Sequence, residues 1–430
     1  MTNKAPIAER GAVKGWCPGA LRPMETGDGL IVRVRGRAGA LTTRQLRGIG
    51  GISRHFGNGV VDLTRRANVQ VRGIEADDLP GVWSRLSDCD LIDANADAEA
   101  VRNVMVNPLS GRDPTETVNA RPIAEALEAE LSHRPQFWAL PGKFGFSVDG
   151  GGMLSLDGER ADIRLRAARA GERAMIAVGA DRKSATDWLC LVDPALAHEA
   201  ALSLAAAFLA CAKDCPRARM RDLPDEALEG LRRALSADGL PDGDVAFSVH
   251  SRGDRVGLLE GGSLVAVGIG APLGRLESQA MEVLADAAEA LGVTDIFLSP
   301  WRVLYLPVGD ARAAGHLLGI ARDLGLVTSA ADPLMAIDAC PGAPACCSAC
   351  LDTRAAARRV AALLPLPGIS SVHISGCAKG CARSKPADLV LVDCEAGFGV
   401  IRNGTAEAPP GAYMKPEDLD ALRGLLKPGH

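Results

Sequence analysis

The feature of this sequence that most restricts its fold is an internal repeat. When the chain of 430 residues is compared with itself at a shift of 235 residues, the segment 33–73 aligns without a gap with the segment 268–308. The shift aligns identical glycines and leucines in four places: Gly39 with Gly274, Leu41 with Leu276, Gly57 with Gly292 and Leu63 with Leu298. Identities are few, but a register held without gaps along both segments indicates a duplicated unit.

Both copies of the repeat predict the same secondary structure. A strand precedes the shared glycine, a helix opens at Thr42 or Glu277, and residues that favour strands follow at 60–63 and 296–298. Each copy is therefore a β-α-β unit of α+β type. We expect two pseudo-symmetric halves, divided near residue 236, where a helix end is followed by a linker.

Composition describes an ordinary globular chain. Apolar residues make up 47% and charged residues 23% of it, and its length favours more than one domain. The first residues lack the apolar core of a secretory signal. The longest uncharged stretch in the helical regions, 200–212, is shorter than the roughly 18 residues that a membrane-spanning helix needs. We therefore expect a cytoplasmic protein with no membrane partner.

The charge distribution is more informative than the net charge of -5. Residues 1–75 contain 13 Lys and Arg against 5 Asp and Glu, which suits a ligand with many negative charges, although a solvated basic face is the alternative. Nucleic acid is disfavoured because aromatic residues are only 3% of the chain and do not alternate with the basic ones. In the repeat, Arg33 and Arg35 align with Gly268 and Gly270, so we expect the first half to bind an anion.

Two cysteine-rich stretches lie in the second half. Twelve cysteines in a cytoplasmic chain are seldom disulfides, so those that cluster indicate metal ligation. Cys340 and Cys346 have five residues between them, and Cys377 and Cys381 have three. Four thiolates are what a 4Fe-4S cluster requires, and sulfur ligands suit iron–sulfur clusters or zinc better than hard cations.

The residues around the second pair fit a cluster. Three of them are small enough to let backbone N–H groups approach the sulfides of a cluster: Gly376, Ala378 and Gly380. Three others are basic and would offset the charge of a thiolate-ligated cluster: Lys379, Arg383 and Lys385. Zinc held by Cys347 and Cys350 with the later pair, or buried structural thiols, are the alternatives. If a cluster forms, Cys347, Cys350 and Cys394 are expected to be packing residues or spares. We interpret His373 as a structural strand residue, and Cys211 and Cys215 as structural residues on one helix face.

These cysteines and three further segments resemble the sulfite and nitrite reductases that carry siroheme coupled to a 4Fe-4S cluster. The segments are LTRRANVQVRG (63–73), RNVMVNPLSG (102–111) and LPGKF (140–144). The resemblance implies two ferredoxin-like units, each with an α/β lobe, and four cluster ligands: Cys340, Cys346, Cys377 and Cys381. It implies half-domains at 16–90 and 236–325, with lobes at 91–235 and 326–430. Cys381 matches the cysteine that bridges cluster and siroheme iron.

The resemblance also suggests an anion site and two departures from the family pattern. Residues that match basic groups around siroheme carboxylates and substrate are Arg35, Arg66, Arg102 and Lys143. The reductases have a second lysine where this sequence has Gly145, and commonly an asparagine where it has Lys379. Six-electron reduction of sulfite or nitrite needs repeated protonation of the bound oxyanion, so the missing lysine disfavours that reaction.

One branch of this family resembles the chain more closely, the precorrin-3B synthases of oxygen-dependent cobalamin biosynthesis. The matching segments are WCPGALRPMETGDGLIVRVR (16–35) and SGCAKGCARSKPADLVLV (375–392). The resemblance implies a monooxygenase that takes precorrin-3A, hydroxylates C20 and closes a γ-lactone, with O2 and with electrons from NADH, directly or through a reductase partner. It implies a mononuclear non-haem iron beside the cluster, whose ligands and catalytic residues the sequence does not assign. The alternatives are a siroheme-dependent sulfite or nitrite reductase, and a cluster protein without its own chemistry.

Overall fold

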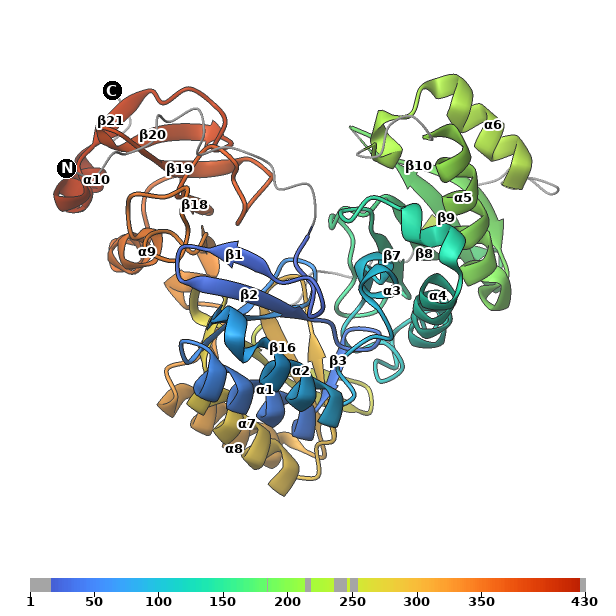
Figure 1. The fold of residues 1–430 in the computed structure, drawn as a ribbon, viewed down its shortest axis with the longest axis horizontal. Helices are drawn as coiled ribbons and strands as arrows, with labels where there is room; N and C mark the ends of the chain where they lie inside the picture. The colour runs from blue at the N-terminus through green and yellow to red at the C-terminus, as the bar shows by residue number, and fades with distance from the viewer. Residues whose placement is uncertain (1–16, 184, 213–217, 236–245, 248–253, 426–430) are drawn as a thin grey trace.

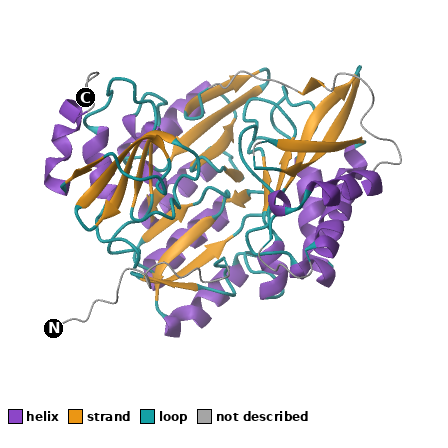
Figure 2. Cartoon of the chain, turned by 90° about the horizontal axis from the view of Figure 1, so that it is seen from above, coloured by secondary structure: helices purple, strands orange, loops and turns teal. Residues whose placement is uncertain are grey.

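The computed structural model describes residues 17–183, 185–212, 218–235, 246–247 and 254–425. Trp16, Cys215 and the expected dividing point at residue 236 lie outside the described residues. Figure 1 shows two lobes set apart from each other, with a helix-backed pair of sheets between and below them. Seen from above in Figure 2, the strands gather toward the middle and most helices lie outside them.

The two copies of the repeat form two five-stranded antiparallel sheets that exchange a strand. The first sheet has the order β1 (Met24–Thr26), β2 (Gly29–Val34), β5 (Val69–Ile74), β4 (Val60–Leu63) and β14 (Arg275–Glu277). The second has the order β12 (Gly257–Gly261), β13 (Leu264–Gly270), β16 (Val303–Val308), β15 (Asp295–Leu298) and β3 (Ala40–Thr42). Each sheet therefore takes its last strand from the other copy, at equivalent positions of the repeat.

Four helices cover one face of these two sheets, as Figure 1 shows. They are α1 (Thr43–Phe56), α2 (Leu79–Asp88), α7 (Ser278–Ala290) and α8 (Ala311–Asp323). Thr42 and Glu277 are the N-caps of α1 and α7, as the sequence predicted, and Thr42 forms a reciprocal capping box with Gln45. Apolar side chains of both copies share one core, so the exchanged strands join two units that pack as one body.

The backbone conformation repeats even at aligned positions where the two copies have different residues. Ala67 and Arg302, which the 235-residue shift aligns, both have left-handed backbones, with φ of 53° and 63°. Ala38 and Leu273 form a second aligned pair, with φ of 44° and 53°. Because this conformation is uncommon for residues other than glycine, its recurrence at matched positions supports a common origin of the two halves.

The two lobes also share one topology. Lobe 1 has the order β10 (Thr186–Val192), β9 (Arg173–Asp181), β8 (Ile163–Ala170), β7 (Phe146–Asp149) and β6 (Val104–Val106), with β11 (Ala246–Phe247) paired to β8. Lobe 2 has the order β17 (Ile337–Ala339), β18 (Val372–Ser375), β19 (Ala387–Cys394), β20 (Gly397–Gly404) and β21 (Ala412–Met414). In both lobes the first three strands in sequence are parallel and the remaining neighbours antiparallel.

Helices pack on each lobe. Lobe 1 carries α3 (Ala96–Val101), α4 (Arg121–His133), α5 (Ala197–Cys211) and α6 (Asp225–Leu235), and lobe 2 carries α9 (Thr353–Ala361) and α10 (Leu422–Leu425). The window Pro194–Cys211 is long and apolar enough to span a membrane by length and composition, which the count of uncharged residues had missed because the window includes Glu199. Its residues Leu202 and Phe208 are buried in the core of lobe 1, where α5 packs against β8 and β9.

Candidate cluster site and anion pocket

The topology of lobe 2 brings the two cysteine stretches to one edge of its sheet. Cys340 directly follows β17, and Cys377 follows β18 by two residues. Because these neighbouring strands are parallel, both chains leave the sheet at the same edge. Cys346 and Cys381 lie further along the same two loops, so all four cysteines belong to one loop pair.

The thiols of the four cysteines lie near enough to influence one another's ionisation. Burial raises the pKa of the Cys381 thiol, and Cys377, Cys340 and Cys346 raise it further. Burial likewise raises the pKa of Cys346, with added contributions from Cys340, Cys347 and Cys377. Among the described residues, no group of three or more His, Cys, Asp or Glu is closed tightly enough to hold a metal ion. The two loops therefore place the four expected sulfur ligands in one neighbourhood, and their role as cluster ligands stays a prediction.

A backbone N–H group already approaches one of the four sulfurs. Gly376 N–H donates to Cys340 Sγ over 3.0 Å. A Cβ atom on Gly376 would lie 2.6 Å from the Cβ of Ala349, so a larger residue would push the two loops apart. This contact is to a cysteine sulfur, so the expected approach of Gly376 N–H to a cluster sulfide stays a prediction.

The remaining cysteines lie apart from this convergence. Cys347 and Cys350 are exposed, so of the two expected roles they fit that of spares and not that of packing residues. Cys394 is half-buried and donates to the carbonyl of Gly397. Cys211 is exposed at the end of α5, so it does not pack on a helix face either. The described cysteines form no disulfide.

The basic residues near Cys381 divide into two kinds. Lys379 favours the thiolate of Cys381, as expected for a residue that offsets cluster charge. Arg383 instead donates to Asp338 over 3.0 Å, and Lys385 donates to the carbonyl of Gly158 in lobe 1. These two side chains therefore tie the cysteine loop to its surroundings.

His373 lies buried on β18, two residues before the strand ends at Ser375. It is fully buried, and neither ring nitrogen has a hydrogen-bond partner among the described residues. Burial lowers its pKa to about 4, although neighbouring Asp338 acts in the opposite direction. The interpretation of His373 as a buried strand residue is confirmed, and its imidazole is neutral at pH 7.

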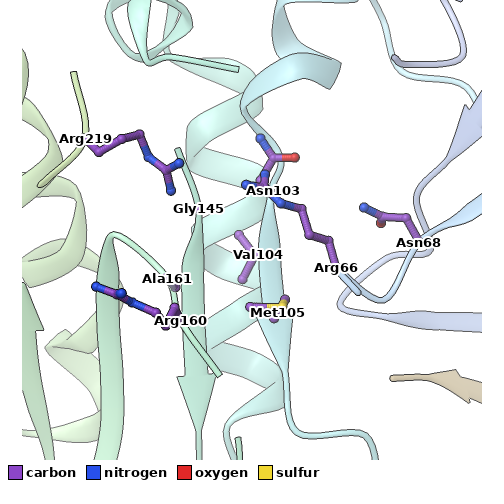
Figure 3. Close-up of a pocket in the computed structure, with 9 residues that line it drawn as sticks. All are labelled: Arg66, Asn68, Asn103, Val104, Met105, Gly145, Arg160, Ala161 and Arg219. Carbon is purple, nitrogen blue, oxygen red and sulfur yellow. The ribbon is translucent and has the colours of Figure 1, made fainter. Parts of the chain in front are cut away.

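A pocket lined by arginines lies where lobe 1 meets the first half-domain. Its lining residues, all labelled in Figure 3, are Arg66, Asn68, Asn103, Val104, Met105, Gly145, Arg160, Ala161 and Arg219. Arg66 and Asn68 reach it from one side, and Arg160 and Arg219 from the other. The enclosed space is about 30 Å³, roughly the volume of one water molecule.

Arg66 offers an unused donor in this pocket. Its Nη2 donates to the carbonyl of Lys143 over 2.7 Å, while its Nη1 is buried with no partner among the described residues. A buried guanidinium N–H without an acceptor costs free energy unless a ligand or water supplies one. Positive charge is concentrated here: burial lowers the pKa of Arg66, and repulsion from Arg219 across the pocket lowers it further. The pocket therefore favours an anionic group.

The floor of the pocket is built on Asp162. This carboxylate accepts from Gly145 N–H over 2.9 Å and from Arg219 Nε over 2.8 Å. Arg160 pairs separately with Asp181. A Cβ on Gly145 would meet nothing closer than the carbonyl of Asn103 at 3.5 Å, so the fold tolerates a side chain here but the sequence leaves the space open.

Two of the four basic residues expected at the anion site are held by carboxylates. Arg35 is buried and donates to Glu99 over 2.7 Å. Arg102 is buried, donates to both oxygens of Asp93 and lies 3.6 Å from Glu128. Burial opposes its charge, yet Glu128 and Asp93 outweigh this and raise the pKa of Arg102. Both arginines thus hold lobe 1 against β2 and the residues that follow it.

Two family models match the chain. The Nitrite/Sulfite reductase ferredoxin-like half domain matches residues 22–89, and the Nitrite and sulphite reductase 4Fe-4S domain matches residues 97–304. A precorrin-3B synthase from a Sinorhizobium species is 31% identical over 96% of this chain and 88% of its own length. The chain belongs to the nitrite and sulfite reductase family.

Other members of the nitrite and sulfite reductase family are more distant. The chloroplastic ferredoxin–nitrite reductase of Arabidopsis thaliana is 26% identical over 85% of this chain and 67% of its own. A ferredoxin-dependent sulfite reductase of Mycolicibacterium paratuberculosis is 26% identical over 84% of this chain and 69% of its own. The solved structure of the Mycobacterium tuberculosis NirA protein matches with a TM-score of 0.72 at 22% identity, covering 93% of this chain and 82% of that one. The predicted α+β fold with two ferredoxin-like halves is confirmed.

Family membership bears on the cofactor and not on each ligand. The 4Fe-4S domain match supports a 4Fe-4S cluster, but the matched residues end before Cys340. The ligand set therefore rests on the spacing of the cysteines and on their convergence. Sequence reasoning missed Arg160, Arg219 and Asp162, because no motif marked them. Asn68 and Asn103 lay unremarked inside two of the matching segments.

Proposed function

We propose that this chain is a monooxygenase that converts precorrin-3A to precorrin-3B in cobalamin biosynthesis, by C20 hydroxylation and γ-lactone formation. The observation that carries the proposal is the arginine-lined pocket in which Gly145 stands where the reductases have a lysine. The guanidinium donors of this pocket suit one carboxylate of a substrate that carries several, and the missing lysine disfavours the reduction of a small oxyanion. Identity of 31% to a precorrin-3B synthase along nearly the whole chain supports the same conclusion.

The hydroxylation balances as a monooxygenation. One atom of O2 enters the C20–H bond as hydroxyl, and the other leaves as water after taking two electrons and one proton from the reductant and a second proton from solvent. NADH would supply these electrons, directly or through an electron-donor reductase. The reaction needs a soluble tetrapyrrole and a reduced nicotinamide, which agrees with a cytoplasmic location.

We assign the cofactor roles to this chain's own residues as follows. Cys340, Cys346, Cys377 and Cys381 would hold a 4Fe-4S cluster, which supplies single-electron transfer when bound. A mononuclear non-haem iron completes the proposal. Gly376 N–H, which already meets Cys340 Sγ, would also face the cluster sulfur and favour its negative charge.

Among the four basic residues, we assign direct substrate contact to Arg66 and Lys143. Arg66 has an Nη1 without a partner among the described residues, and Lys143 is exposed beside it. Arg35 and Arg102 donate to buried carboxylates, so we propose that they support substrate binding by fixing the strand and loop that carry the pocket. Guanidinium groups suit carboxylates because they bind them with two parallel hydrogen bonds.

The test is isotopic. Anaerobically purified protein would be given precorrin-3A and NADH, with a reductase if needed, and then 18O2. The proposal expects a product that contains a single 18O atom and appears with one equivalent of NADH consumed. Reduction of sulfite or nitrite by the same preparation, with no labelled tetrapyrrole, would return the chain to the siroheme reductases.

A further inference from the structure

Each of the two cysteine loops accepts a hydrogen bond from an arginine that lies outside lobe 2. Arg72 on β5 is almost fully buried and donates through Nη2 to the carbonyl of Ala345, the residue before Cys346, over 2.8 Å. Arg302 donates through Nη2 to the carbonyl of Ala382, the residue after Cys381, over 3.1 Å. Each half-domain thus holds the peptide beside one of the proposed cluster ligands.

Carboxylates fix both guanidinium groups in place. Arg72 donates two hydrogen bonds to Asp28, of 3.0 and 2.7 Å, and lies 3.5 Å from Asp62. Arg302 donates to Asp338 over 2.9 Å, and the second oxygen of Asp338 accepts from Arg383. Asp338 lies two residues before Cys340 and Arg383 two residues after Cys381. The same ion pairs therefore connect the two cysteine loops to each other.

The two contacts were not inherited together from the repeat. The 235-residue shift aligns Arg302 with Ala67 and aligns Arg72 with Pro307. Arg302 keeps the left-handed backbone of its counterpart, an arrangement that an arginine adopts only against a steric cost of about 1 kcal/mol or more. Contacts with Asp338 and Ala382 offset that cost. Each half-domain therefore acquired its own arginine toward the cysteine loops.

Each network carries more positive than negative charge. Around Asp62 and Asp28, three arginines meet two carboxylates: Arg72, Arg275 and Arg354. Around Asp338 and Glu159, three arginines again meet two carboxylates: Arg65, Arg302 and Arg383. A thiolate-ligated cluster is negatively charged and becomes more so on reduction. Nearby uncompensated cations favour the reduced form.

We propose that Arg72 and Arg302 are positioning residues of the cluster: each fixes the peptide carbonyl beside a cysteine ligand, and the charge around them raises the cluster's reduction potential. This inference rests on the proposed cluster. It predicts that the two arginines act through position and charge separately. Lysine at either place keeps the charge and loses the two-pronged contact, whereas glutamine loses the charge.

The experiment uses the anaerobically purified holoprotein and four variants: Arg72→Lys, Arg72→Gln, Arg302→Lys and Arg302→Gln. Iron and acid-labile sulfide, the midpoint potential in a spectroscopic redox titration, and the rate of cluster loss to a chelator are measured. All four variants are expected to lose the cluster about tenfold faster than wild type, since each loses a charge-assisted hydrogen bond. Only the glutamine variants are expected to shift the midpoint to more negative values.

Arg173→Gln is the matched control, because Arg173 forms an exposed ion pair with Asp193 in lobe 1. Midpoints and loss rates of all four variants within the range of this control would overturn the inference. If a glutamine variant does not fold, the lysine variants still test the inference. Their rate of cluster loss to the chelator is either faster than that of wild type, as expected, or within the range of the control. Wild type without labile sulfide would overturn the cluster itself, while wild type with sulfide and unchanged variants would overturn only the role of the arginines.

Discussion

The two lobes have the same sheet topology, but different residues join the two loops at the edge of each sheet. In lobe 2, Cys340 follows β17, its N–H donates to the carbonyl of Ile374 over 3.2 Å, and its Sγ accepts from Gly376 over 3.0 Å. In lobe 1, Asn107 follows β6 and makes the corresponding contacts.

The correspondence in lobe 1 is atom for atom. Asn107 N–H donates to the carbonyl of Val148 over 3.3 Å, and its side-chain oxygen accepts from Gly150 N–H over 3.0 Å. Its side-chain amide also donates to the carbonyl of Gly151 over 3.1 Å. An asparagine thus bridges the two loops that cysteines occupy in lobe 2. The same loop geometry therefore forms around an asparagine in lobe 1 and around a cysteine in lobe 2, so the scaffold supplies the geometry and the proposed cluster chemistry depends on the cysteines.

The largest effect is expected from giving lobe 2 the residue of lobe 1. Cys340→Asn should reduce acid-labile sulfide to background, because one of four ligands is gone. The asparagine oxygen can still accept from Gly376, so the far-ultraviolet circular dichroism of the chain should be unchanged. Cys347→Ser is the control and should keep its sulfide. Retention of the cluster in Cys340→Asn would remove Cys340 from the ligand set.

The reciprocal change in lobe 1 is expected to be next in size. Asn107→Ala leaves Gly150 N–H and the Gly151 carbonyl without partners, which should destabilise the loops after β6 and β7 by about 3 kcal/mol. Amide hydrogen exchange at Gly150 and Gly151 measures this directly. Asn107→Cys should recover part of the loss, since Cys340 Sγ accepts the same bond in lobe 2. Equal exchange in all three proteins would break the comparison.

The division of labour between the lobes predicts that substrate binding and cluster content separate. Arg66→Ala should weaken anaerobic precorrin-3A binding by about 2 kcal/mol, roughly 30-fold, and leave labile sulfide unchanged. Calorimetric titration without reductant gives the affinity, and Arg173→Ala serves as the control. Loss of sulfide together with affinity would mean that Arg66 is structural and that the two functions are not divided as described.

The smallest effect concerns His373, which occupies the position on β18 that Ser147 occupies on β7. Burial holds its pKa at about 4, below the unfolded value of about 6.5, so the unfolded chain binds more protons between these values. Stability is therefore full above pH 6.5 and falls as the pH drops toward 4. The metal-free chain should lose about 2 kcal/mol between pH 7.5 and pH 5 from this group.

Urea unfolding of wild type and His373→Ser at the two pH values checks that expectation. The variant should be less stable at pH 7.5 because it leaves a cavity, but its loss on acidification should be about 2 kcal/mol smaller. An equal loss in both proteins would show that His373 takes up a proton in the folded chain as readily as in the unfolded one.

Much of the fold followed from the repeat, because its register fixed matched strands and the helix starts at Thr42 and Glu277. The exchange of β3 and β14 did not, since each copy alone encodes the strand but not the sheet that receives it. Parallel pairing of β17 and β18 explains why cysteines far apart in sequence meet.

The candidate site was harder to predict from the sequence where the interacting residues are far apart along the chain. The carboxylates that hold Arg35 and Arg102, on residues 93, 99 and 128, follow no spacing rule relative to those arginines. For the same reason the sequence did not mark Arg72 as more than a strand residue, although it donates to the carbonyl of Ala345, 273 residues further along the chain. The exposure of Cys347 was also unpredictable, because spacing alone does not say which of two adjacent cysteines turns inward.

The central claim is that this scaffold carries a cluster in lobe 2 and no haem. An anaerobic absorption spectrum, with iron and acid-labile sulfide counted on the same sample, tests it most directly. The account predicts a broad absorption shoulder without haem bands, about four sulfides per chain, and slightly more iron than sulfide. Intense haem bands, or zinc without labile sulfide, would contradict it.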